Sequence, residues 1–196
     1  GFNVLLAGGV NLVREPRNGR NFEYGGEDPL LAGVMVGEQI RGIQSQRIIS
    51  TIKHFAYNDQ ESGRHILNVE LDEAAARISD LLAFEFAIER SNPGSVMCAY
   101  NRVGGTYACE NDWLLNDVLK RDWSYPGFVM SDWGAVHSTE KAANAGLDQQ
   151  SAYTFDKQPF FGKPLADAVT AGRVPQARLD DMARRILTAM FTHGVV

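Results

Sequence analysis

The sequence predicts an α/β fold with a parallel sheet, specifically a partial (β/α)8 TIM-type barrel with about five of the eight βα units. Short apolar segments typical of strands alternate with longer segments of helical periodicity, which favours parallel strands joined by right-handed crossovers. Polar residues follow each predicted strand, as expected when functional side chains gather at the carboxyl ends of barrel strands. An open doubly wound sheet is less favoured, because no glycine-rich dinucleotide fingerprint follows any strand.

The alternation is clear in the first half of the chain. An apolar strand is expected at 4–10 and a β-branched strand at 48–55, with a helical pattern at 31–44 between them. Polar loops follow both strands. The segment 72–90 predicts one long amphipathic helix, because apolar residues recur near helical spacing at Ala75, Ile78, Leu82, Phe86 and Ile88.

The second half of the chain continues the same order. Strands are expected at 95–100 and 128–131, helices at 111–120 and near 138–145, a strand-end segment from 146–148, and helices within 164–191. Asn111 or Asp112 is a plausible N-cap for the helix at 111–120, because both residue types accept backbone hydrogen bonds. The segment Gly172-Arg173-Val174-Pro175 separates the last helices.

Composition narrows the function classes. The 196 residues are 44% hydrophobic and 22% charged, with a net charge of −5. This charge argues against a dedicated nucleic-acid-binding protein, which usually carries a basic patch. No apolar run is long enough to span a bilayer, so we expect no membrane partner. Two cysteines without further Cys or His ligands do not predict a zinc site, and we expect no metal or other cofactor.

The two cysteines flank a Gly104-Gly105 turn, at Cys98 and Cys109. They could form a local disulfide in an oxidising compartment or remain two reduced core thiols. The sequence leaves both states open, because a disulfide needs a specific geometry that spacing does not reveal.

The start of the chain indicates a larger parent protein. Its first residues, Gly-Phe-Asn-Val-Leu-Leu, resemble the interior of a folded element, with no initiator methionine and no signal peptide. We expect earlier segments to be missing. Five strands do not close a barrel, so we also expect open sheet edges and an uncovered apolar face that favour association.

The segment F-V-M-S-D-W-G-A at 128–135 places Asp132 and Trp133 directly after an apolar strand. One explanation is a helix N-cap, since Ser and Asp accept hydrogen bonds from the first N–H groups of a helix. The other is a functional carboxylate at the mouth of an α/β fold, with Trp133 as a platform for a sugar ring. The segment alone leaves both explanations open.

Other polar residues at strand ends carry similar alternatives. Arg20 could present its guanidinium to vicinal hydroxyls or belong to a solvated loop with weak ion pairs. Lys53 and His54 suit paired sugar hydroxyls, although adjacent strand residues normally point to opposite faces. Tyr100 could hydrogen-bond a catalytic carboxylate. Met97 is of a type that normally fills cores.

Two histidines lack a metal-ligand pattern. His65 and His137 have no suitably spaced ligand partners, and we interpret both as ordinary loop residues. Asn11 and Asp148 complete the set of polar residues that follow predicted strands.

In combination and in this order, the motifs resemble the N-terminal barrel of family-3 glycoside hydrolases of the β-glucosidase type. The matching segments are G-R-N-F-E-Y-G-G-E-D-P at 19–29, K-H-F-A-Y-N-D-Q-E-S-G-R at 53–64, S-V-M-C-A-Y-N at 95–101, F-V-M-S-D-W-G-A at 128–135 and A-G-L-D at 145–148. The resemblance covers most of the chain, which we interpret as a single partial barrel domain spanning 1–196.

The resemblance implies retaining, exo-acting hydrolysis of terminal β-D-glucosyl residues, with Asp132 as the nucleophile that forms a covalent glycosyl-enzyme intermediate. The residues implied to line the first sugar subsite, directly or beside it, are Arg20, Lys53, His54, Met97, Tyr100 and Trp133. Arg64 matches a recurrent arginine with a supporting role. The family's Lys-His pair is typically joined by a cis peptide.

A retaining glycosidase needs a second carboxyl group as acid/base. In β-glucosidases of this family it comes from a following α/β-sandwich domain, which is absent here together with the first barrel strands. A hexosaminidase branch uses a His–Asp dyad instead, but the loop before His65 lacks that branch's pattern. The resemblance favours a periplasmic or secreted parent protein whose substrate is a β-linked oligosaccharide or glucoside.

Two rival functions stay open at the level of sequence. The chain could be a non-catalytic carbohydrate-binding module that keeps the barrel surface without the chemistry. It could also belong to a β-xylosidase or another exo-glycosidase, since the pocket walls that select the sugar are only partly present. For the isolated chain we expect weak or no turnover, because the acid/base is missing.

Overall fold

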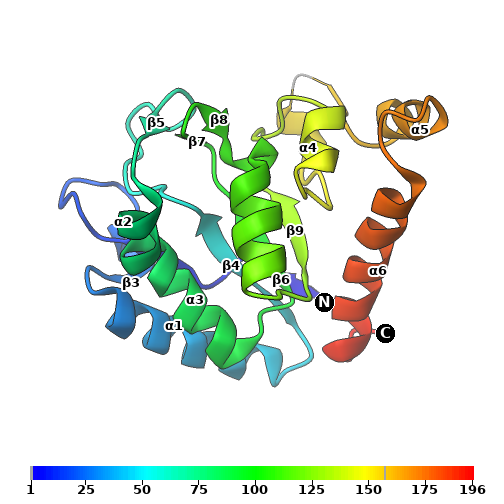
Figure 1. Ribbon diagram of the computed structural model, residues 1–196. Helices are drawn as coiled ribbons and strands as arrows, with labels where there is room; N and C mark the ends of the chain where they lie inside the picture. The colour runs from blue at the N-terminus through cyan, green and yellow to red at the C-terminus, as the bar shows by residue number, and fades with distance from the viewer. Residues whose placement is uncertain (1, 157) are drawn as a thin grey trace.

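The computed structural model describes residues 2–156 and 158–196. Its main sheet contains β2 (Gly9–Leu12), β4 (Ile49–Phe55), β6 (Ser95–Cys98) and β9 (Phe128–Ser131), side by side in chain order and all parallel (Figure 1). Gln149 continues this order with a parallel bridge to Met130 beyond β9. The parallel α/β arrangement of a partial barrel is therefore confirmed.

One edge of the sheet differs from the predicted strand at 4–10. The chain forms β1 (Val4–Leu5), which pairs with the start of β4, and then β2, which pairs with its end. Gly8 lies between them with φ of 111°, a conformation open to glycine that interrupts an extended strand. The short strand β3 (Tyr24–Gly26) then pairs with the outer side of β2.

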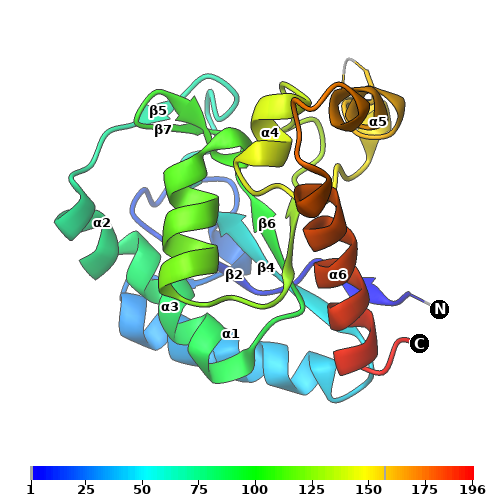
Figure 2. The ribbon, with the colours of Figure 1, turned by 45° about the vertical axis from the view of Figure 1, so that its right-hand side comes forward.

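Helices cover the outer face of the sheet. They are α1 (Pro29–Gln44), α2 (Glu73–Ile78), α3 (Asp80–Ser91) and a helix of π-type hydrogen bonding at Trp113–Asp122. The later helices are α4 (Glu140–Asn144), α5 (Lys163–Thr170) and α6 (Gln176–Thr192). In Figures 1 and 2, α1 and α3 lie together along one side, and α6 stands on the other side near both termini.

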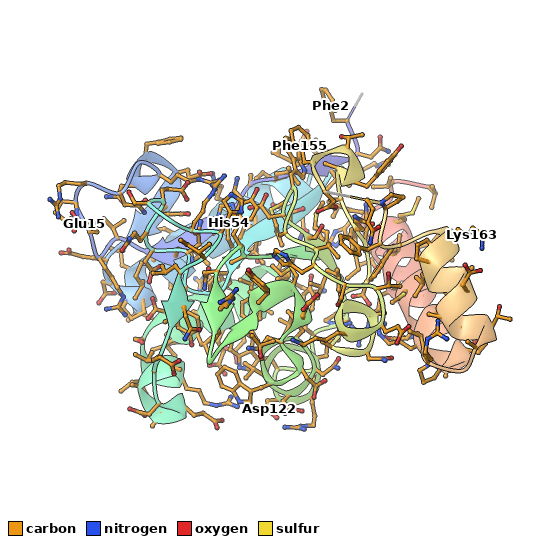
Figure 3. All side chains as sticks on the ribbon, turned by 90° about the horizontal axis from the view of Figure 1, so that it is seen from above. Phe2, Glu15, His54, Asp122, Phe155 and Lys163 are labelled. Atoms are coloured by element: carbon orange, nitrogen blue, oxygen red, sulfur yellow. A yellow bond between two sulfur atoms is a disulfide. The ribbon has the colours of Figure 1, made fainter. Side chains whose placement is uncertain are left out.

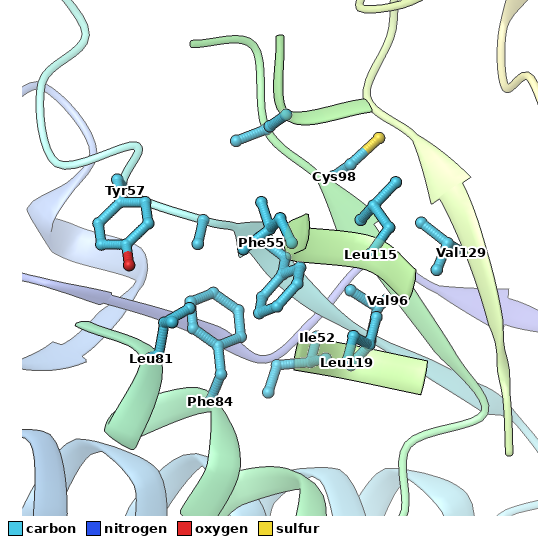
Figure 4. Packing of buried hydrophobic residues seen from close by; sticks show 14 of the residues in the cluster. Ile52, Phe55, Tyr57, Leu81, Phe84, Val96, Cys98, Leu115, Leu119 and Val129 are labelled. Atoms are coloured by element: carbon cyan, nitrogen blue, oxygen red, sulfur yellow. The ribbon is translucent and has the colours of Figure 1, made fainter. Parts of the chain in front are cut away.

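The sheet is buried on both faces, as parallel strands usually are. Two consecutive residues of β6 show this. Val96 packs in the large cluster beneath the helices, whereas Met97 packs on the opposite face with Phe128 and with Ala189 of α6. Figure 4 shows the large cluster, in which Phe55 of β4 meets Phe84 of α3 with ring centroids 5.0 Å apart.

Two predicted helices are altered by local polar contacts. The helix expected at 72–90 is divided at Ser79, whose hydroxyl donates to the Ala75 carbonyl at 2.7 Å and lies 2.9 Å from an Asp80 carboxylate oxygen. Such side-chain bonds compete with helix continuation. The helix expected at 111–120 begins later, at Trp113, and Asn111 rather than Asp112 accepts the N–H of Leu114, at 3.0 Å. The helices predicted within 164–191 are confirmed as α5 and α6.

The carboxyl ends of the strands carry a second, small sheet of β5 (Asn68–Val69), β7 (Arg102–Val103) and β8 (Thr106–Tyr107). A disulfide joins Cys98, at the end of β6, to Cys109, just after β8, with Cα atoms 5.2 Å apart. Of the two states that the sequence allowed, the structure has the disulfide.

The predicted uncovered apolar surface lies at the β1–β3 edge. Phe22, Leu31 and Met35 are each more than half exposed and border a cavity of about 690 Å³. No helix among the described residues is both long and apolar enough to cross a membrane.

Candidate active site

The ends of three neighbouring strands bring the principal candidate residues together. Lys53 and His54 lie at the end of β4, Tyr100 follows β6, and Asp132 follows β9. Since these strands are parallel neighbours, their carboxyl ends form one edge of the sheet. Figure 3 looks onto the molecule from above and shows His54 well inside it, with Glu15 at the periphery.

Asp132 is buried, with 7% of its surface exposed, and its two carboxylate oxygens have different surroundings. Oδ1 accepts the Trp133 backbone N–H at 2.7 Å and the Tyr100 hydroxyl at 3.0 Å. Oδ2 has no hydrogen-bond partner among the described residues and lies 3.6 Å from His54 Nε2. One oxygen is thus fixed by the protein, while the other is buried without a hydrogen bond from the described residues.

Burial raises the pKa of Asp132, because the charged form loses solvation. The bonds from the Trp133 N–H and the Tyr100 hydroxyl oppose this rise by stabilising the carboxylate. The helix-cap explanation for Asp132 is wrong, since the next helix, α4, begins only at Glu140.

His54 is a buried, neutral imidazole. Its exposed fraction is 1%, and burial together with the charges of Arg20, Lys53 and Arg64 lowers its pKa well below the usual value. The Lys53–His54 peptide bond is cis, as the resemblance implies. Adjacent strand residues normally point to opposite faces, but the side chains of Lys53 and His54 both lie at the carboxyl edge of the sheet.

The carboxylates of Glu23 and Glu61 form ion pairs with the cationic side chains of the site. Glu23 accepts from Arg20 Nε at 2.5 Å and pairs with Lys53 Nζ at 2.9 Å. Glu61 accepts from Arg64 at 2.7 Å and lies 3.8 Å from the guanidinium of Arg20. The guanidinium of Arg64 in turn lies over the ring of the Tyr100 side chain, 4.2 Å from its centroid.

Trp133 and Met97 occupy different positions relative to this edge. Trp133 is 46% exposed, stacks on Phe155 with ring centroids 5.6 Å apart, and borders a pocket of about 610 Å³ beside Tyr100. Met97 is 2% exposed and packs lower on the inner face of the sheet, against apolar neighbours that include Phe128. The expected subsite role of Met97 stays a prediction.

Comparison with known proteins identifies the family of this chain. The model of the glycosyl hydrolase family 3 N-terminal domain matches residues 1–189. The chain belongs to glycoside hydrolase family 3. β-Glucosidase BoGH3A of Bacteroides ovatus is 40% identical over 200 residues, covering 96% of this chain and 27% of the relative. An exo-α-(1→6)-L-arabinopyranosidase of Bifidobacterium breve is also 40% identical, covering 94% of this chain and 24% of the relative.

Solved family-3 structures share the fold. β-Glucosidase 3B of Thermotoga neapolitana, solved in complex with α-D-glucose, superimposes with a TM-score of 0.91 at 38% identity, covering 96% of this chain and 27% of that protein. The family-3 chain described here therefore spans about a quarter of the length of the relatives it matches.

Several residues of this family-3 site were missed by reasoning from strand ends. Glu23 ends a short 3-10 helix at Asn21–Glu23, and Tyr24 begins β3, which pairs back onto β2. No local pattern signals that return. His65 and His137, interpreted as ordinary loop residues, border the 610 Å³ pocket; His65 lies against the ring of Tyr100 with centroids 4.4 Å apart.

Asp148 follows a predicted strand end but does not lie in the site. Its side chain is fully buried away from the site and accepts from Lys120 at 2.9 Å, Arg178 at 2.6 Å and the Val129 N–H at 2.7 Å. It ties α6 and the Trp113–Asp122 helix to β9. Within the described residues, no three His, Cys, Asp or Glu side chains group as metal ligands.

Proposed function

We propose that this chain supplies the nucleophile and much of the sugar subsite of a retaining, exo-acting β-glucosidase. The observation that carries the proposal is the asymmetry of Asp132, whose Oδ1 is held by Trp133 and Tyr100 while Oδ2 has no partner among the described residues. An oriented carboxylate with one available oxygen is what nucleophilic attack on an anomeric carbon needs.

In the proposed reaction, Asp132 Oδ2 forms a bond to the anomeric carbon as the bond to the leaving-group oxygen breaks. An acid protonates that oxygen, and the product is a covalent ester between the sugar and Asp132. Water, deprotonated by the same group, then attacks the anomeric carbon as the bond from that carbon to Asp132 breaks, which releases the sugar and restores the carboxylate. Tyr100 and the Trp133 N–H keep Oδ1 fixed through both steps.

The acid/base is proposed to come from outside these 196 residues. Glu23 lies near the site, but its ion pairs with Arg20 and Lys53 lower its pKa despite burial and keep it ionised. Glu61 is engaged by Arg64 and by the Asn58 amide. Each glutamate therefore serves to place cations, and Arg20 and Lys53 remain suited to bind sugar hydroxyls.

The proposal is tested by trapping the intermediate in the full-length protein that carries this chain. A 2-fluoro-glucoside with a good leaving group reacts quickly and is released slowly, so the labelled peptide can be mapped by mass spectrometry. We expect the label on Asp132, and none in an Asp132→Asn variant. Labelling of another residue, or turnover unchanged by Asp132→Asn, overturns the assignment.

A second candidate differs only in the sugar. Relatives named exo-α-(1→6)-L-arabinopyranosidase are as similar to this chain as a β-glucosidase, with about 40% identity in both cases. A panel of nitrophenyl β-D-glucoside, β-D-xyloside and α-L-arabinopyranoside distinguishes them by kcat/KM. The highest value for the arabinopyranoside replaces the glucosidase proposal without changing the role of Asp132.

The isolated chain is expected to show little turnover. Loss of a general acid/base alone costs on the order of 10²–10⁴-fold. Adding the remainder of the protein should restore hydrolysis; a non-catalytic carbohydrate-binding module would bind sugar and stay inactive.

A further inference from the structure

The surroundings of His54 carry an inference that rests on the proposed function and extends it to Tyr24. The Tyr24 hydroxyl lies 3.2 Å from His54 Nδ1, and the two rings meet edge to face with centroids 6.1 Å apart. The other ring nitrogen, Nε2, lies 3.6 Å from Asp132 Oδ2. The imidazole is therefore placed between a phenol and the proposed nucleophile.

The backbone of His54 is fixed as firmly as its ring is enclosed. Its N–H donates to Asn11 Oδ1 at 2.8 Å, and its carbonyl oxygen accepts from Asn11 Nδ2 at 2.9 Å. Both Asn11 and His54 are 1% exposed. Because the backbone of His54 is fixed and its ring is buried, the ring cannot easily turn to bring the other nitrogen toward Asp132. Which nitrogen carries the proton therefore decides what the ring presents to Asp132.

A neutral imidazole carries its proton on either Nδ1 or Nε2. If the proton were on Nδ1, the Nε2 lone pair would face the carboxylate of Asp132. If it is on Nε2, the N–H points to that carboxylate, and Nδ1 is left to accept a hydrogen bond. Tyr24 can supply that bond, because burial raises the pKa of its hydroxyl and keeps it protonated.

We propose that Tyr24 is a positioning residue: its hydroxyl donates to His54 Nδ1 and fixes the tautomer in which Nε2–H faces Asp132 Oδ2 and the sugar bound beside it. The donor is then ready for the substrate without a proton shift or a ring rotation. In general, a hydrogen bond donated to one imidazole nitrogen keeps the proton on the other nitrogen and so fixes the tautomer.

Asn58 provides the alternative that the proposal must exclude. Its carbonyl oxygen lies 3.4 Å from the Tyr24 hydroxyl, which could donate there while accepting from a protonated Nδ1. The carboxylate of Asp132 disfavours that arrangement, because it would face a lone pair. Direct observation of the imidazole proton separates the two.

The experiment uses Tyr24→Phe in the full-length protein, with Tyr57→Phe as the matched control. Tyr57 is also buried, at 3% exposure, and its hydroxyl has no hydrogen-bond partner among the described residues. We expect kcat/KM to fall about tenfold in Tyr24→Phe, the loss of roughly one hydrogen bond to a working group, and to change less than twofold in Tyr57→Phe. Equal activity of the two variants overturns the proposal.

Two readouts distinguish positioning from a purely structural role. Nitrogen NMR of histidine-labelled protein, with His54→Gln to assign the resonance, should show Nε2–H in the wild type and a mixture of tautomers in Tyr24→Phe. A glutamine amide donates without tautomers, so Tyr24→Phe should cost less than twofold in the His54→Gln background. An Nδ1–H wild type, or the same loss in both backgrounds, overturns the proposal.

Failure of this inference is separable from failure of the proposed function. If Asp132 is labelled by the fluoro sugar while Tyr24→Phe behaves like Tyr57→Phe, only the role of Tyr24 is lost. If Asp132 is not labelled, the nucleophile assignment fails first.

Discussion

Two buried aspartates follow predicted strands, yet they lie in regions of opposite character. Around Asp148, both carboxylate oxygens are bonded by the protein: two cations reach Oδ1, and the Val129 N–H reaches Oδ2. Around Asp132, the protein binds Oδ1 and leaves Oδ2 without a hydrogen bond, beside a neutral imidazole. The first arrangement joins helices to a strand, and the second keeps a carboxylate available for a ligand.

The difference teaches that burial and position after a strand do not by themselves mark a catalytic acid. The distinguishing feature is a carboxylate oxygen that no protein group binds, as at Asp132, because such an oxygen is not committed to a structural contact. Substitutions at the two positions should therefore affect different properties, activity at one and stability at the other.

The largest effect is expected for Asp132→Asn in the full-length protein. Loss of a nucleophile should lower kcat on the order of 10⁴-fold or more. Thermal unfolding should not shift downward, because burial already disfavours the charged form of this side chain. A large fall in Tm with partial activity retained would place Asp132 with Asp148 as a structural acid.

Asp148→Asn should produce the converse result. Removing the charge leaves Lys120 without its carboxylate partner and Arg178 with Asp181 alone. Breaking such a buried pair costs about 3–5 kcal/mol of unfolding free energy. Urea unfolding measures this loss, and kcat per folded molecule should stay within about twofold of wild type.

Asp167→Asn is the control for Asp148→Asn. Asp167 forms an exposed pair with Lys163 at 2.6 Å, and exposed pairs contribute about 0–1 kcal/mol. Equal destabilisation by the two substitutions would contradict the buried-network role of Asp148.

Tyr100→Phe tests how Asp132 is kept ionised. The Tyr100 hydroxyl stabilises the carboxylate, so its removal should raise the pKa of Asp132 further. The acid limb of kcat/KM should then move to higher pH, because the carboxylate form of Asp132 is the reactive one. An acid limb that stays in place would show that this bond does not tune Asp132.

The smallest effect is expected where α1 packs against α3. A Cβ at Gly33 of α1 would lie 2.8 Å from the Ala83 carbonyl oxygen of α3, so Gly33→Ala should cost about 1–2 kcal/mol of stability by overpacking. Gly42→Ala in the same helix meets nothing within 4 Å and should stabilise by about 0.4–1 kcal/mol. Neither should alter kcat/KM beyond twofold; a larger change would couple this layer to the site.

Much of the fold was predictable because its signals are local. Strand-like apolar runs, helical periodicity and polar strand ends all lie within short windows, and parallel order follows from the alternation. The same logic placed Lys53, His54, Tyr100 and Asp132 at one edge of the sheet.

What escaped prediction depends on contacts between distant residues. Glu23 and Tyr24 enter the site only because β3 returns to β2, and Asp148 leaves it because Lys120 and Arg178 converge on it from other helices. The break at Ser79 and the pairing of the cysteines likewise depend on geometry that residue types do not specify.

The disulfide between Cys98 and Cys109 has a consequence for protein engineering. The disulfide links the two ends of the segment 98–109, which contains Tyr100 and the hairpin that ends with β8. The ends of this hairpin loop are therefore held together covalently. At its tip, Gly104 and Gly105 have positive φ and open space around them. A foreign peptide grafted between these glycines should be displayed at the rim of the sheet while Tyr100 keeps its place, which unchanged kcat/KM of such a chimera would verify.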